Sequence, residues 1–179
     1  MRVTDLRYPI GRFQMTEPPA AADRDAAITV IALAPGRLRA AVAGLDDFQL
    51  DTPYRPEGWT VRQLVHHLAD SHLNAYCRCK LTLTEERPTI RPYDEGAWAK
   101  LPDSFRPIDG SLALLDHLHD RWVALLRATP AESFRRVCHH PEGKVDLTLD
   151  RLVGLYAWHG THHIAHITEL RRRSGWNHA

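Results

Sequence analysis

Apolar residues recur at alternating spacings of three and four in several stretches of the chain, which is the period of a helix with one buried face. The first such stretch covers residues 23–45, and Pro35 inside it predicts a kink or a break. The second is predicted to cover residues 61–84. Its start is marked by Thr60 and Gln63, which have the spacing of a capping box.

Two more helices are predicted at residues 111–128 and from about residue 148 to the basic run before Gly175. Residues 134–147 hold at most a short hairpin, because a His-Pro-Glu-Gly turn lies within them. Four long helices with little strand favour an all-α fold, a four-helix bundle that forms one domain over residues 1–179.

Two segments lack this periodicity. Residues 1–20 hold three prolines and few periodic apolar positions, so we expect an extended N-terminal arm. Residues 86–109 form a long connection between the second and third helices, with four prolines and several aromatic residues. Connections of this length are uncommon and often functional, although a structural cover over the bundle end is the alternative.

The composition of the chain limits the kinds of partner and the cell compartment that we expect. Lys and Arg number 23 against 22 Asp and Glu, a balance that disfavours nucleic acid as a partner. The sequence shows neither a membrane-spanning apolar run nor the pattern of a signal peptide, so we expect a cytoplasmic protein with no membrane partner. An odd number of cysteines, three, fits a reducing compartment. The unusual count is that of histidine, which is 12.

Several of these histidines fall on the predicted buried face of the last helix. That face lines up Leu152, Tyr156, His159, His163, His166 and Leu170. A buried imidazole without a partner costs about 1 to 3 kcal/mol, so this face requires hydrogen bonds, charges or a metal ion. His159 and His163 have the i, i+4 spacing that lets two rings chelate one ion, although internally satisfied histidines remain the alternative.

A third ligand has several candidates. The second helix carries His66, His67 and His72, and periodicity favours His72, because it lies in the middle of the apolar arc. His119 falls on the apolar face of the third helix, where we expect a core histidine with a backbone partner that could still approach the site. A His-Glu-x-x-His motif is absent, which excludes a metalloprotease of that kind.

Longer motifs carry a family resemblance. They are YPIG at residues 8–11, DTPYR at 51–55, GWTVRQ at 58–63, HHLADSH at 66–72, IRPYDE at 90–95 and WHGTHHIAH at 158–166. These segments resemble the YfiT group of the DinB-like superfamily, and the similarity covers nearly the whole chain.

The resemblance implies a four-helix bundle, a homodimer and one divalent ion per subunit, zinc or nickel. It implies that the ligands are His67, His159 and His163, with water at the remaining positions. Periodicity and the resemblance therefore disagree on the third ligand. We follow the resemblance, because a ligand at the edge of the apolar arc can reach a site near the mouth of the bundle.

The same resemblance implies a metal-dependent hydrolase that acts on a small molecule. Other members of the superfamily transfer low-molecular-weight thiols such as bacillithiol to electrophiles, so a thiol S-transferase is the alternative. One ion with an open position would serve either reaction, since it lowers the pKa of bound water towards about 7 and ionises a bound thiol. A metal- or haem-binding bundle without turnover and a plain helical interaction domain are further alternatives.

Proximity on the helices suggests Asp70, His162 and His166 as candidates for a general base. The long connection supplies candidates for substrate binding, which are Arg91, Tyr93, Asp94 and Trp98.

Overall fold

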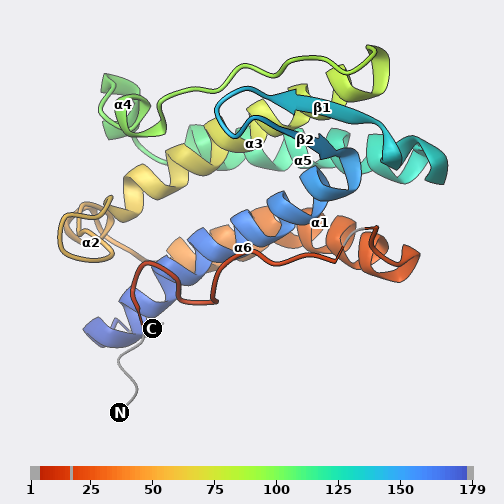
Figure 1. The fold of residues 1–179 in the computed structure, drawn as a ribbon. Coiled ribbons are helices and arrows are strands. Elements are labelled where there is room, and N and C mark those ends of the chain that lie inside the picture. The colour runs from red at the N-terminus through yellow and green to blue at the C-terminus, as the bar shows by residue number, and fades with distance from the viewer. Residues whose placement is uncertain (1–4, 17, 177–179) are drawn as a thin grey trace.

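Four long helices dominate the computed structural model, which describes residues 5–16 and 18–176 (Figure 1). They are α1 (Ala21–Val42), α3 (Val61–Thr84), α5 (Asp109–Ala128) and α6 (Leu149–Ser174). The predicted arm has no helix in its described part, and it runs along α6, where Met15 contacts Gly154. Residues 1–4 and 17 of the arm lie outside the described residues.

The helices form a bundle with an uncommon connectivity. Helix α1 packs against α5 and α6, and α3 packs against the same two helices. Consecutive helices α1 and α3 are therefore diagonal to each other, as are α5 and α6, and only α3 and α5 are both consecutive and adjacent. The predicted all-α four-helix bundle is confirmed.

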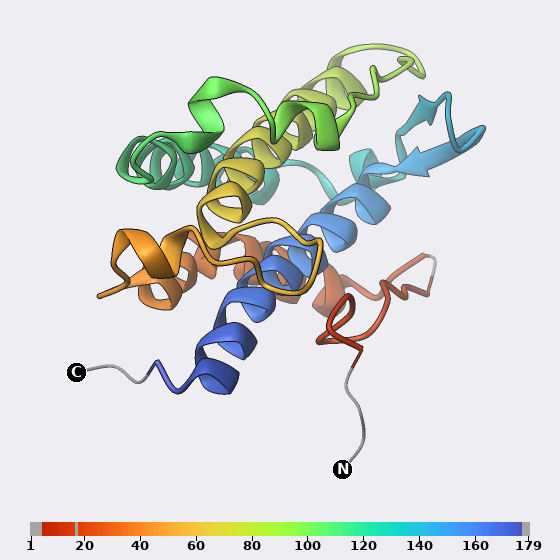
Figure 2. The same cartoon turned by 90° about the vertical axis from the view of Figure 1, so that its left-hand side faces the viewer.

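Short elements occupy the connections. They are α2 (Asp47–Leu50), α4 (Glu95–Trp98), the 3₁₀ turns Pro102–Phe105 and Ala131–Arg135, and strands β1 (Val137–His140) and β2 (Val145–Thr148). The strands form the predicted hairpin, which is antiparallel and places Val137 opposite Thr148. Figure 2 shows this hairpin beside the first turn of α6. Helix α2 was not expected from the sequence, although Asp46 and Gln49 form a capping box at its start.

Local capping chemistry explains where the helices begin and end. Thr60 and Gln63 each accept a hydrogen bond from the other's backbone amide at the start of α3. Gly175 follows α6 with a φ of 67°, a conformation that glycine adopts without steric cost. Of the kink or break predicted at Pro35, the break is wrong, because α1 continues through the proline. Packing holds both halves of α1, since Ile31 and Leu38 on either side of the proline are fully buried.

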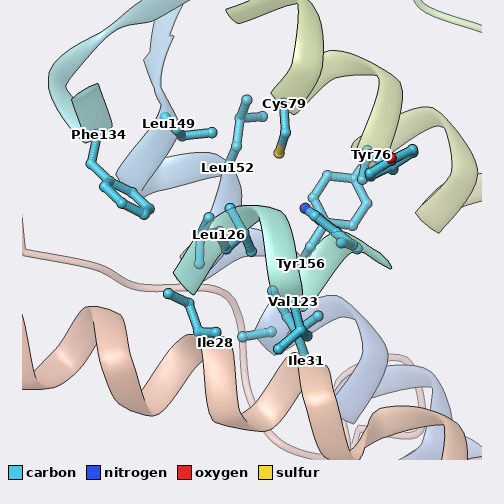
Figure 3. Close-up of a cluster of buried hydrophobic side chains, with 14 of the residues drawn as sticks. Ile28, Ile31, Tyr76, Cys79, Val123, Leu126, Phe134, Leu149, Leu152 and Tyr156 are labelled. Carbon is cyan, nitrogen blue, oxygen red and sulfur yellow. The ribbon is translucent and has the colours of Figure 1, made fainter. Parts of the chain in front are cut away.

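The hydrophobic core has two parts along the bundle axis. Figure 3 shows the part near the hairpin, where Ile31, Cys79, Phe134 and Leu149 meet. The other part lies at the opposite end and includes Leu38, Val61, Leu64, Leu112 and Ile167. On α3 and α6, His72 and His159 lie in the sequence between the residues of the two parts, and His119 of α5 is hydrogen-bonded to His72. A polar layer of imidazoles thus separates two apolar halves of the bundle.

Within the described residues, none of the helices has the length and apolar character that crossing a bilayer demands.

Candidate metal centre

Three imidazoles converge between α3 and α6. His67 comes from α3 and is buried, while His159 and His163 come from α6 and are half-buried. One ring nitrogen from each lies within 4.8 Å of the others, and the Nε2 atoms of His67 and His159 are 3.3 Å apart. The sequence-predicted set therefore meets at one point. No other group of this kind occurs among the described residues.

The chemistry of this donor set fits a divalent cation. Burial lowers the pKa of His67 to about 4, and burial together with the neighbouring imidazoles holds the pKa of His159 and His163 well below the usual value. All three rings are neutral near pH 7, which is the form that binds a metal ion. A tetrahedral zinc ion with bonds of about 2.0 to 2.1 Å separates its nitrogen ligands by about 3.3 to 3.4 Å. The separation between His67 and His159 matches that distance.

The three imidazoles form part of the wall of a cavity of about 310 Å³. Its other lining residues are Trp59, Ser71, Arg78, Pro92, Tyr93, Glu95, His140, Glu142, Leu155, Tyr156, Trp158 and His162. A cavity of similar size, about 330 Å³, lies between the arm and the helices α1 and α6 and contains none of the converging histidines. The first cavity has room for a small molecule beside the candidate ligands.

The long connection contributes less to this wall than its sequence suggested. Of its four candidates, Tyr93 lines the cavity, and burial raises the pKa of its hydroxyl to about 12. Trp98 packs against the Tyr93 ring with centroids 4.4 Å apart. Asp94 instead accepts a hydrogen bond from the amide of Ala97 at the start of α4, and the side chain of Arg91 is exposed. Neither Asp94, Arg91 nor Trp98 is among the lining residues.

Of the three candidates for a general base, one lines the cavity and two do not. His162 lines the cavity, stacks on Trp158 and is buried, and its Nδ1 atom has no hydrogen-bond partner. His166 is buried against the Tyr54 ring and is engaged at both nitrogens. Asp70 does not line the cavity. Its pKa is raised, mainly by burial and to a smaller extent by the negative charge of Asp103.

His72, which periodicity favoured as a ligand, does not join the converging group. It is 1% exposed and lies behind His159, with its Nε2 atom 3.3 Å from Nδ1 of His159. His119 lies further back and has the expected backbone partner, the carbonyl of Ile31, at 2.7 Å from its Nδ1 atom. Periodicity identified the most buried histidine of α3, whereas a ligand must also reach open space.

Several lining residues were missed from the sequence. Ser71 and Arg78 follow His67 on α3 at spacings of four and eleven, so a helical wheel centred on His67 would have found them. His140 is the first residue of the His-Pro-Glu-Gly turn noted in the sequence. It is half-buried and lines the cavity with Glu142, because the hairpin folds against α3 and α6. No local signal in the sequence places these hairpin residues.

Comparisons with known proteins agree with this architecture. The model of the DinB superfamily matches residues 31–167. YfiT of Bacillus subtilis (strain 168) is 54% identical over 179 residues, which cover 99% of this chain and 100% of that protein. A Bacillus cereus (strain B4264) protein is 53% identical over 97% of this chain and 100% of its own length. Both are provisionally named metal-dependent hydrolases.

A solved structure is also similar throughout. It is that of YfiT from Bacillus subtilis, described as a probable metal-dependent hydrolase with an unusual four-helix bundle topology. The TM-score is 0.94 at 55% sequence identity, and the match covers 96% of this chain and 99% of that one. The chain therefore belongs to the DinB superfamily and, within it, to the group of YfiT.

Proposed function

We propose that the protein is a metal-dependent hydrolase in which His67, His159 and His163 hold one zinc or nickel ion. The observation that carries this proposal is the convergence of three neutral imidazoles from α3 and α6 at the wall of a cavity. When bound, the ion supplies Lewis acidity, which polarises a carbonyl or phosphoryl oxygen and makes water a better nucleophile. Relatives named as metal-dependent hydrolases support the assignment.

The cavity suits a small substrate. Arg78 donates hydrogen bonds to the Tyr156 hydroxyl and to the backbone carbonyl of Arg91, which fixes its guanidinium group at the wall. Ser71, Tyr93 and Tyr156 bring hydroxyl groups to the same space. These side chains orient a polar small molecule, and Trp59 and Trp158 offer it apolar surface.

His162 is the residue that we assign to proton transfer. It lines the cavity beside His163, and burial lowers its pKa, so the ring is neutral near pH 7 and can act as a base. His166 is occupied by hydrogen bonds, and Asp70 does not reach the cavity, so neither is assigned this role.

Thiol transfer is the competing proposal, because the same imidazole group and cavity could serve a bound thiol. Haem binding is less compatible with the geometry. Its axial ligands lie on opposite faces of a flat ring, whereas three imidazoles here surround one point. The homodimer and the absence of a nucleic-acid or membrane partner remain predictions.

One experiment separates the two reactions. The protein is stripped with a chelator, reloaded with zinc or nickel, and assayed on a panel of activated esters and amides, with and without a low-molecular-weight thiol. We expect hydrolysis without thiol that disappears on stripping and in His159→Ala, and that persists in His117→Ala, an exposed histidine of α5. If the substrates are converted only when thiol is present, to thiol conjugates, the protein is a thiol transferase and not a hydrolase. If no substrate is converted with or without thiol, the proposal that the protein is an enzyme is refuted.

A further inference from the structure

A chain of hydrogen bonds connects the candidate centre to the backbone of α1. The Nδ1 atom of His159 lies 3.3 Å from Nε2 of His72, and Nδ1 of His72 lies 2.9 Å from Nε2 of His119. The chain ends at the carbonyl oxygen of Ile31, 2.7 Å from Nδ1 of His119. Three imidazoles from three helices are thus joined to one main-chain acceptor.

The carbonyl at the end of this chain sets its direction. A carbonyl oxygen only accepts, so the proton of His119 must lie on Nδ1 and its Nε2 atom must be bare. His72 then donates from Nδ1 to that bare nitrogen, and His159 donates from Nδ1 to Nε2 of His72. A neutral imidazole has one proton, so Nε2 of His159 is left with its lone pair.

Pro35 explains why this carbonyl is available. In an α-helix, the amide of residue 35 would donate to the carbonyl of Ile31, but proline has no amide hydrogen. The proline that failed to break α1 therefore frees a buried acceptor for His119. Gly160 leaves space for the next ring, because a Cβ atom at that position would lie 3.2 Å from Cε1 of His72.

The second ligand of α6 has a shorter chain of the same kind. Nε2 of His166 lies 3.3 Å from the carbonyl oxygen of Arg7 in the arm, and Nδ1 of His166 lies 3.4 Å from Nδ1 of His163. The carbonyl requires the His166 proton on Nε2, so His163 donates from Nδ1 and its Nε2 atom is bare.

We propose that His72, His119 and His166 are positioning residues, which use the carbonyls of Ile31 and Arg7 to fix the tautomers of His159 and His163 and thereby present two bare Nε2 atoms to a divalent cation. The inference rests on the proposed metal site. It adds a role for three histidines that touch neither the ion nor the substrate. Partners that orient metal-binding histidines in this way typically contribute about 10- to 100-fold to affinity.

The direct test needs no metal and no variant. Long-range ¹H–¹⁵N correlation spectra of the metal-free protein at pH 7.5 report which ring nitrogen carries each proton. We expect protons on Nδ1 of His72, His119, His159 and His163, and on Nε2 of His166. A proton on Nε2 of His159 would overturn the proposal.

Zinc affinity, measured by competition with a chromophoric chelator, supplies the second readout. We expect His72→Phe and His119→Phe to weaken binding about 10- to 100-fold. The matched control is His66→Gln. His66 is a buried histidine of α3, and its hydrogen-bond partners, Ser111 and the Arg106 carbonyl, belong to neither chain of hydrogen-bonded histidines. Unchanged affinity in a folded His72→Phe variant would contradict the proposal. If the variants do not fold, the wild-type spectra still decide.

Failure of this inference differs from failure of the proposed function. Expected tautomers and tight zinc binding without any hydrolysis would refute the hydrolase and leave the positioning chains intact. Hydrolysis by a protein whose metal-free form carries the His159 proton on Nε2 would support the hydrolase and refute the positioning chains.

Discussion

His67 and His159 are 92 positions apart in the chain, yet their Nε2 atoms face each other across 3.3 Å at the contact between α3 and α6. Neither helix can form this site alone, since α6 provides two of the three imidazoles and α3 provides the third. The site is therefore a property of the packed bundle.

The first prediction concerns metal content. His67→Ala, His159→Ala and His163→Ala each remove one nitrogen from the converging group, so zinc- or nickel-reconstituted variants should hold much less than one ion per chain. Elemental analysis after gel filtration measures this. His117→Ala, which removes an exposed histidine, should retain the wild-type content. A ligand variant that keeps a full ion would remove that residue from the proposed set.

The second prediction concerns proton transfer. His162→Gln should lower kcat for ester hydrolysis about 100-fold or more, because a positioned general base contributes about 10²- to 10⁴-fold. Metal content should not change, since His162 is not part of the converging group. Kinetics and elemental analysis on the same sample separate the two effects. Loss of the ion together with activity would show a structural role instead.

The third prediction concerns pH and stability. Burial lowers the pKa of His119, so below pH 6.5 the unfolded chain takes up a proton that the folded chain resists. The free energy of unfolding of the metal-free protein should therefore fall as pH decreases, by up to about 1.4 kcal/mol per pH unit for this group. Urea denaturation at pH 7.5, 6 and 5 measures the slope. His119→Gln should show a smaller slope, and an equal slope would argue against a buried neutral His119.

The fourth prediction concerns Gly160. An alanine there would press its Cβ atom against the His72 ring, displacing it by a few tenths of an ångström, so zinc affinity should fall. Gly36→Ala is the matched control, because it also lies inside a long helix and its Cβ atom would meet nothing within 4 Å. The control should gain about 0.5 to 1 kcal/mol of stability and keep its affinity. Equal affinities in the two variants would contradict the close fit around His72.

Local chemistry made most of the fold predictable from the sequence. The Thr60 and Gln63 pair fixes the start of α3, and Gly175 marks the end of α6, because caps depend only on neighbouring residues. The break that Pro35 allowed does not occur, since whether a proline ends a helix depends on what packs against it. In α1 the surrounding core decides, with Ile31 and Leu38 fully buried on either side.

The candidate site was predictable only in part. Periodicity measures how deeply a side chain points into the bundle, and by that measure His72 exceeds His67. Whether a side chain also reaches a cavity does not follow from periodicity. His67 was chosen as a ligand because of the family motifs. His140 and Glu142 line the cavity because of the position of the hairpin. That position is set by contacts between residues that are far apart in the sequence.

The diagonal connectivity also sets an order of events during synthesis on the ribosome. Because α3 borders α6 and not α1, His67 has no imidazole from α6 to meet until residues 159–163 have been translated. A nascent polypeptide that stops before residue 159 holds only one member of the converging set. Under the proposed function, cation capture therefore has to follow the synthesis and packing of α6.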